Sequence, residues 1–246
     1  MQAHPFDTLP SRRPLLLPEL ALPAPLTVVM LAPHPDDFDA IAVTMRFLQQ
    51  HGHLLHVAVL TAGANGVEDG WNGARDAAAK TALREAEQRA SCSFFGLAPE
   101  RLRFLRLWED ENTDAERDRA RLRDYLAETA PDLVFLPHGN DSNRTHRRTY
   151  ESFRDIVAAE GWRLHACLNL DAKTVDMRPD LYMYFDEPDA GWKAQMLRLH
   201  RSQQERNLKT RGHGFDQRVL QVNRDAATSA GAPLPYAEVF ELQRFG

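Results

Sequence analysis

The sequence has 246 residues, of which 43% are hydrophobic and 26% charged, an ordinary balance for a soluble globular protein with room for one large domain. Its formal net charge is -5, whereas proteins that bind nucleic acids carry basic patches, so we expect no nucleic-acid partner. No apolar run is long enough to span a membrane, and we expect no membrane partner. The two cysteines, Cys92 and Cys167, form no CxxC motif, which favours a reduced, cytoplasmic setting.

The N-terminal segment 1–24 is rich in proline and shows no periodicity, so we expect an extended arm on the surface or on a neighbouring subunit. Residues 25–246 are expected to form a single domain. The arm and the tail 209–246 are the segments that we expect to form contacts if the protein is a homo-oligomer.

Strand and helix patterns alternate along most of the chain. The expected strands are 26–32, 54–60, 102–107, 133–136 and 164–170, and the expected helices are 39–50, 75–96, 114–130 and 145–160. This alternation predicts an α/β fold, a Rossmann-like and mostly parallel sheet with helices on both faces. Later in the chain we expect an edge strand at 182–185, a helix at 190–208 and a short closing strand at 235–242.

A polar turn, His34-Pro35-Asp36-Asp37, follows the first strand and precedes the first helix. Turns of this kind are where open α/β sheets bind their ligands. Side chains three residues apart, such as His34 and Asp37, can face one ion, and both are good zinc ligands. Asp36 would then be free to act on a water bound to the metal. The competing interpretation is a solvated acidic loop in which Asp36 or Asp37 caps the next helix.

A second polar loop follows the strand 133–136 and opens the next helix. It contains His138, directly after the strand, and His146, at the start of the helix. Because the carboxyl ends of parallel strands share one edge of the sheet, either histidine can meet His34 and Asp37 at one ion. Two histidines and one aspartate leave a position open for water, as in catalytic zinc sites.

These residues resemble the PIG-L/LmbE family of zinc-dependent N-deacetylases. The resemblance spans most of the chain, and several scattered motifs occur in the same order. Besides His34-Pro35-Asp36-Asp37 and the late histidine, they are the Gly-rich loop after the second strand, Leu83-Arg84-Glu85-x-Glu87, Phe104-Leu105 followed by Asp110, and Tyr-Ala-Glu-x-Phe at 236–240.

The resemblance implies a Rossmann-like metalloenzyme that removes acetyl from an N-acetylglucosamine-type amino sugar. It implies that His34, Asp37 and His146 bind the metal and that Asp36 is the general base. Zinc is the expected metal, although a site with two histidines and one aspartate also suits Fe²⁺ or another first-row divalent ion. Arg84 is the nearest match to an arginine that contacts the substrate in this family.

The chain departs from the family pattern at two positions. Phe38 stands where the family has glutamate, and we expect altered fine structure but a retained metal. Asn143 stands where the family has the histidine that stabilises the oxyanion. Asparagine can donate a neutral hydrogen bond to an oxyanion, but it cannot act as a general acid. His138 could supply the missing imidazole; the alternative for His138 is a strand-end histidine bonded to the backbone.

Three residues are the candidate substrate-binding groups, namely Arg84, Asp110 and His138. The alternative for Arg84 is a solvated helix-surface arginine paired three residues away, and the alternative for Asp110 is a solvated loop acid.

The predicted function is hydrolysis of an N-acetyl bond on an N-acetylglucosamine-type small molecule, with Asp36 as base and Asn143 at the oxyanion. Two alternatives stay open. One is an amidase that acts on a non-sugar or thiol conjugate through the same site. The other is a catalytically weak metal- or sugar-binding relative, which the departures at Phe38 and Asn143 motivate.

Overall fold

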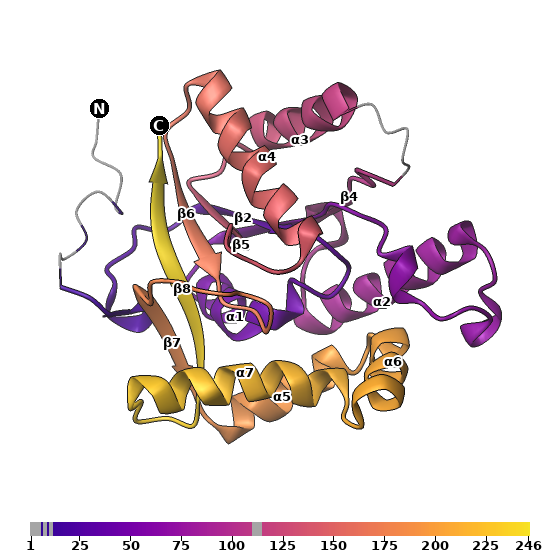
Figure 1. The fold of residues 1–246 in the computed structure, drawn as a ribbon. Coiled ribbons are helices and arrows are strands. Elements are labelled where there is room, and N and C mark those ends of the chain that lie inside the picture. Colours follow the sequence, from indigo (N-terminus) through magenta and orange to yellow (C-terminus); the bar gives the residue numbers. More distant parts are fainter. Residues whose placement is uncertain (1–5, 7–8, 10–11, 110–114) are drawn as a thin grey trace.

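An eight-stranded sheet forms the centre of the structure, a computed structural model that describes residues 6, 9, 12–109 and 115–246 (Figure 1). In chain order the strands are β1 (Leu15–Leu16), β2 (Thr27–Ala32), β3 (Leu54–Val59), β4 (Leu102–Phe104), β5 (Leu133–Pro137), β6 (Leu164–Asn169), β7 (Leu181–Phe185) and β8 (Tyr236–Phe245). They lie in the order β1-β7-β8-β6-β5-β2-β3-β4. Neighbouring strands are parallel, except that β8 runs antiparallel to β6 and β7. The prediction of a mostly parallel α/β sheet is confirmed.

Helices cover both faces of this sheet. The α-helices are α1 (Ala42–Gln50), α2 (Ala77–Phe95), α3 (Ala115–Thr129), α4 (Arg144–Glu160), α5 (Glu187–Leu197), α6 (Arg201–Arg211) and α7 (Phe215–Ala230). Short 3-10 helices lie at Leu17–Glu19, Asp39–Ile41, Ala64–Gly66, Trp71–Gly73 and Pro99–Arg101. Helices α3 and α4 pack on one face, and α1, α2 and α5 on the other (Figure 1). No helix of the described residues is long and apolar enough to cross a membrane.

The central strand β2 explains why the sequence of a buried strand is apolar at nearly every position. Val28 and Met30 point into the core on the side of α1, where Met45 is also buried. The intervening Val29 belongs to the core on the opposite face, together with Phe153 of α4. A strand that is covered on both faces needs apolar residues at every position, because successive side chains point to opposite sides.

The order of the strands places a topological switch at β2. From β2 the chain moves outward through β3 and β4 on one side, and then returns to build β5 and β6 on the other side. In open α/β sheets, the crevice at such a reversal, outside the carboxyl ends of the strands, is where ligands bind. The turn after β2 and the loop after β5 both lie at this reversal.

Two expectations for the C-terminal third are wrong. The helix expected at 190–208 is interrupted, because α5 ends at Leu197 and α6 begins at Arg201. Between them His200 is fully buried, and its Nε2 lies 3.1 Å from Oδ1 of Asp39. The burial of this imidazole beside the turn that follows β2 turns the chain where the sequence contains no glycine or proline.

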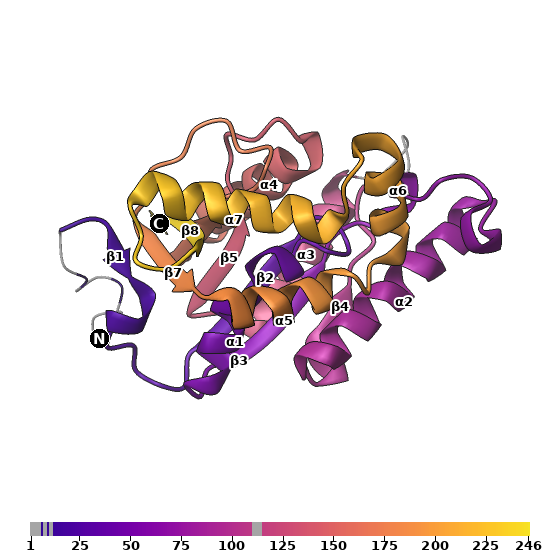
Figure 2. The same cartoon turned by 90° about the horizontal axis from the view of Figure 1, so that it is seen from below.

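The expected edge strand at 182–185 is also misplaced. It belongs to β7, which lies inside the sheet between β1 and β8. The long helix α7 was not expected, and it packs across β7 and β8 (Figure 2). Buried residues Ala227 on the helix and Val239 on β8 belong to the small apolar cluster between them.

The described part of the proline-rich segment 1–24 adds a strand to the sheet. Leu15 and Leu16 pair in parallel with Leu181 and Tyr182, so β1 forms the outer edge beside β7. Leu17, directly after this strand, is 1% exposed and belongs to the main core. The division into a 1–24 arm and a 25–246 domain stays a prediction.

Candidate active site

Carboxylates and imidazoles from three strand ends meet at one edge of the sheet. The turn after β2 supplies His34 and Asp37. The loop after β5 supplies Asp141, and the first turn of α4 supplies His146. Asp171 follows β6. The strands are parallel, so their carboxyl ends share this edge, and residues more than 100 positions apart in the sequence come into contact.

His34, Asp37 and His146 form the candidate metal centre. Nδ1 of His34 lies 3.1 Å from Oδ2 of Asp37, and Nε2 of His146 lies 3.5 Å from Oδ1 of Asp37. One possible ligand atom from each residue can be chosen so that all three lie within 4.8 Å of one another. Imidazole nitrogen and carboxylate oxygen are the donors that zinc and related first-row ions bind, so these residues fit such an ion.

Asp141 fixes the orientation of the His146 ring. Its Oδ2 lies 3.0 Å from Nδ1 of His146, and its side chain is fully buried. Histidines that bind metals commonly donate their second ring N–H to a carboxylate in this way, which leaves Nε2 for the metal. Asp171 was missed by the sequence analysis, and its Oδ2 lies 3.7 Å from the same Nδ1. The signal that could have found it is a carboxylate just after a parallel strand that ends at the same edge.

The contact between His146 and Asp37 displaces the pKa of both groups in the metal-free protein. Burial alone would lower the pKa of His146, but the charge of Asp37 and the hydrogen bond to Asp141 raise it to about 10. Burial alone would raise the pKa of Asp37, but His146 and His34 hold it well below its ordinary range. At neutral pH the metal-free site therefore contains a protonated His146 beside an ionised Asp37.

The affinity of the metal-free protein for Zn²⁺ should rise about tenfold per pH unit between pH 6.5 and 8.5. His146 must lose its proton before Nε2 can bind a metal, and its pKa of about 10 lies above this whole interval. The raised pKa of His146 also stabilises the folded metal-free protein. This stabilisation is complete at pH values below about 6.5, the ordinary histidine pKa, and is lost as the pH rises through about 10. Competition with a coloured chelator at several pH values measures the slope, and a flat profile would contradict this assignment.

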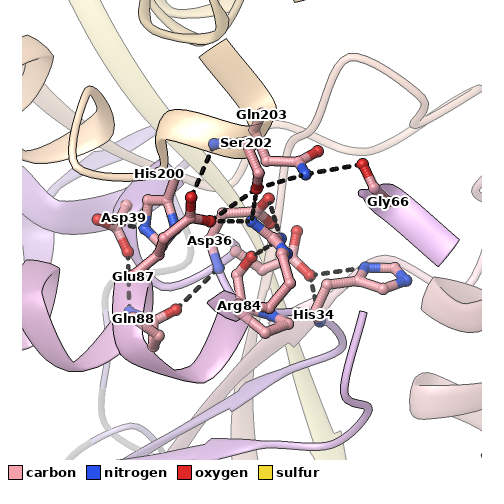
Figure 3. Close-up of polar contacts among 12 residues, drawn as sticks. His34, Asp36, Asp39, Gly66, Arg84, Glu87, Gln88, His200, Ser202 and Gln203 are labelled. Carbon is pink, nitrogen blue, oxygen red and sulfur yellow. Dashed lines mark hydrogen bonds and ion pairs between the residues drawn. The ribbon is translucent and has the colours of Figure 1, made fainter. Parts of the chain in front are cut away.

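Asp36 lies beside the candidate metal centre and is held by two side chains of α2 (Figure 3). It is 9% exposed, and its φ of 125° is a conformation that residues with side chains rarely adopt. Its backbone N–H donates to Oε1 of Gln88 at 2.8 Å, and its Oδ2 accepts from Nη2 of Arg84 at 2.7 Å. Burial raises the pKa of the Asp36 carboxyl above its ordinary value, and the Arg84 guanidinium opposes this only in part.

Arg84 is 2% exposed. The interpretation of Arg84 as a solvated residue on the helix surface is therefore wrong. Nη1 of Arg84 lies 3.2 Å from Oε2 of Glu87, and its Nη2 also donates to the backbone oxygen of Pro35. Glu87 in turn accepts from the backbone N–H and the hydroxyl of Ser202, both at 2.7 Å (Figure 3). The guanidinium therefore joins the turn 34–37 to α2 and to the start of α6. A contact of Arg84 with substrate stays a prediction.

A second buried layer supports the turn from behind. Nε2 of Gln88 donates to Oδ2 of Asp39 at 3.1 Å, and the hydroxyl of Ser91 donates to Oδ1 of the same carboxylate. His200 contacts Asp39 from the segment between α5 and α6 (Figure 3). These contacts surround the helical turn that follows Asp36, so the unusual backbone of Asp36 is fixed from both sides.

Asn143 is the N-cap of α4. Its Oδ1 accepts from the backbone N–H of Thr145 at 3.0 Å, which satisfies one of the unpaired donors at the start of the helix. This contact fixes the orientation of the amide. Among the described residues, none accepts a hydrogen bond from its Nδ2, and the residue lines the cavity described below.

The other sequence candidates lie elsewhere. His138 is not part of the cavity: its Nδ1 accepts from the backbone N–H of Asn140 at 3.0 Å, and its Nε2 lies 3.4 Å from Oε2 of Glu241. This position matches the alternative interpretation of His138, a histidine at a strand end that is bonded to the backbone. Asp110 lies outside the described residues. Phe38 is fully buried and packs edge-on against Phe95, with ring centroids 5.0 Å apart.

A cavity of about 750 Å³ opens over the candidate metal centre. The residues that line it include His34, Asp36, Asp37, Asn143 and His146. Its walls come from the Gly-rich loop after β3, from the segment after β4 and from α6 and α7. A cavity of this volume accommodates a ligand of the size of a sugar derivative.

The fold and this site define a Rossmann-like α/β protein with a candidate His₂Asp metal centre at the switch point of its sheet. The family model described as PIG-L, GlcNAc-PI de-N-acetylase, matches residues 29–157, which is more than half of the chain. The chain therefore belongs to the PIG-L family, and the family expected from the sequence motifs is confirmed. Among curated protein sequences, none matches this chain.

Solved structures of similar fold include two deacetylases and a hydratase. N,N'-diacetylchitobiose deacetylase from Pyrococcus horikoshii is 19% identical with a TM-score of 0.71, over 89% of this chain and 84% of that chain. Teicoplanin deacetylase Orf2 is 15% identical with a TM-score of 0.64, over 89% and 98%. GalB, the 4-carboxy-2-hydroxymuconate hydratase from Pseudomonas putida KT2440, is 20% identical with a TM-score of 0.65, over 88% and 95%. Identities this low establish a shared fold, which hosts more than one reaction.

Proposed function

We propose that the protein is a metal-dependent N-deacetylase that removes acetyl from an N-acetylglucosamine-type substrate. The observation that carries this proposal is the position of Asp36, a buried carboxyl with a raised pKa beside the cluster of His34, Asp37 and His146. Membership of the PIG-L family supports the reaction and the class of substrate.

His34, Asp37 and His146 would hold the ion, with zinc as the first candidate and other first-row divalent ions as alternatives. When bound, such an ion lowers the pKa of water to about 7 and polarises a carbonyl oxygen. Asp141 keeps His146 in the tautomer that leaves Nε2 for the metal.

Asp36 is the group that moves protons. It accepts a proton from the water that attacks the acetyl carbon, and it returns this proton to the amine nitrogen as the C–N bond breaks. The products are acetate and the free amino sugar, so the carboxylate is regenerated after each turnover. Arg84 and Gln88 hold the carboxyl and its backbone in place during both transfers.

Besides Asp36, Asn143 is the residue that would contact the acetyl group during the reaction. Because its Oδ1 caps α4, its Nδ2 is the donor that remains for an oxyanion at the acetyl carbon. A neutral amide stabilises this charge without a change in protonation, which assigns both proton transfers to Asp36.

Product analysis tests this function. Metal-loaded protein is incubated with N-acetylglucosamine, its methyl glycoside, N,N'-diacetylchitobiose and the non-sugar amide N-acetylphenylalanine, and acetate and free amine are measured separately. The proposal requires equal amounts of acetate and amine from at least one sugar. Release from the non-sugar amide alone would indicate an amidase of different specificity. No release from any compound by metal-loaded protein would favour a binding relative.

A further inference from the structure

The cavity is lined by a group of four cationic side chains, which we call the basic wall. It consists of Lys173, Arg206, Arg211 and Arg218. Lys173 follows β6, the first two arginines belong to α6, and Arg218 lies in the first turn of α7. Helices α6 and α7 pack against each other at this side of the molecule (Figure 2). Three separate segments therefore present positive charge to one cavity.

The basic wall lacks counterions among the described residues. None of the ion pairs of those residues includes Lys173, Arg211 or Arg218. The contact given for Arg206 is a weak one, from Nη1 to the backbone oxygen of Gly66 at 3.4 Å. Neighbouring cations of the same helical region do have partners: Lys209 pairs with Glu68 at 2.7 Å. Like charges that share a cavity without counterions repel one another and attract an anion.

The cavity is also lined by carboxylates, and the contacts of two of them are known. Asp36 and Asp37 belong to the turn 34–37, and Asp171 lies 3.7 Å from His146. Glu109 comes from the segment after β4, where its charge acts on Arg106. The cavity lining therefore contains both a cluster of imidazoles and carboxylates that suits a metal ion and a basic wall that suits an anion.

At the start of α7 the first two backbone N–H groups already donate to side chains, so we expect the side chains of the basic wall to bind the anion. The backbone N–H of Gly214 donates to Oε1 of Gln217 at 2.8 Å, and that of Phe215 donates to Oε1 of Gln204 at 2.7 Å. Next to the basic wall, Asn207 lines the cavity but is only 6% exposed. Its Nδ2 donates to the backbone oxygen of Gln203 at 2.8 Å, and its Oδ1 is buried without a hydrogen-bond partner among the described residues.

We propose that the substrate is an N-acetylated amino sugar that carries an anionic group, a phosphate or a carboxylate, and that Lys173, Arg211 and Arg218 bind this group. The position of the acetamide at the candidate metal centre rests on the function proposed above. The recognition of the anion rests on the basic wall alone, so it can be tested without turnover.

Binding to the metal-loaded Asp36→Asn protein tests the proposal, because this variant should not consume the ligand. Calorimetry compares N-acetylglucosamine-1-phosphate, N-acetylglucosamine-6-phosphate and the carboxylate N-acetylmuramic acid with the neutral methyl glycoside of N-acetylglucosamine. We expect at least one charged sugar to bind about tenfold or more tightly than the neutral glycoside, and 0.5 M NaCl to reduce this preference. Which of the three is preferred identifies the anion and its position. Equal affinity for all four compounds would overturn the proposal.

Charge-removing variants locate the preference. In the same background, Arg211→Gln with Arg218→Gln should reduce the ratio of charged to neutral affinity at least about fivefold. Arg201→Gln removes the same charge from an exposed position of α6 outside the cavity, and it should leave the ratio unchanged. A preference that survives the double variant would overturn the proposal, because the anion would then lie elsewhere. A preference for charged sugars in a protein that releases no acetate would contradict the proposed reaction and leave the anion site intact.

Discussion

Replacement of Asp36 by asparagine is expected to lower kcat for acetate release by about 10²- to 10⁴-fold, the range that a positioned general acid–base group contributes. The reason is local: Asp36 is a buried carboxyl of the cavity that adjoins Asp37 and is held by Arg84, and it is not one of the three donors of the His34–Asp37–His146 cluster. An amide keeps the size of the side chain, and its oxygen can still accept from Nη2 of Arg84. The variant should therefore fold with an unchanged melting temperature to within a few degrees and bind about one metal ion, and elemental analysis beside the kinetic assay checks both.

The matched control for this variant is Asp69→Asn. Asp69 is a carboxylate of the Gly-rich loop whose partner is Lys80, and it does not line the cavity. Its replacement should change kcat less than about twofold, since an exposed ion pair contributes little. Substantial activity of Asp36→Asn with full metal content would show that another group accepts the proton.

Replacement of His146 by alanine is expected to remove the metal and, with it, the activity. Its ring lies between Asp37 on one side and Asp141 on the other, and its side chain is 4% exposed. Loss of the ring removes one of the three donors of the cluster. The affinity for Zn²⁺ should fall by more than about 100-fold, beyond the effect that supporting residues around a metal commonly have. His146→Gln preserves more of the packing and serves if the alanine variant unfolds.

Asp141→Asn is the matched control for the histidine variant. It keeps the three donors but weakens the contact that orients His146, so the affinity should fall by about 10- to 100-fold. Activity should return when the metal is supplied in excess, whereas that of His146→Ala should not. Normal metal affinity in His146→Ala would exclude this histidine as a ligand.

Much of the fold could be predicted from the local sequence. The apolar run of β2 and the turn that follows it indicated a buried parallel strand that ends in a polar site, because both features depend on adjacent residues. The pairing of His34 with Asp37 follows from their spacing of three residues. The meeting of this turn with His146 needed only one further rule, that parallel strands share a carboxyl edge.

The parts that could not be predicted depend on contacts between distant segments. The break between α5 and α6 contains no helix-breaking residue, and at this break His200 is buried beside Asp39, a residue more than 150 positions away. The surroundings of Arg84 depend on Ser202 and Glu87, which meet only when α6 packs against α2. A helical pattern gives the face of a residue relative to its own axis, but it does not say which element will cover that face.

A titration of acetate release with metal tests the central claim most directly. Protein is stripped with a chelator, residual metal is measured by elemental analysis, and Zn²⁺ is added in steps with the sugar that is the best substrate in the product analysis. The account predicts no acetate release by the stripped protein and a linear increase that ends at about one ion per chain, as expected for one three-residue site. Full activity of the stripped protein would contradict the account, as would complete metal binding that produces no acetate from any sugar.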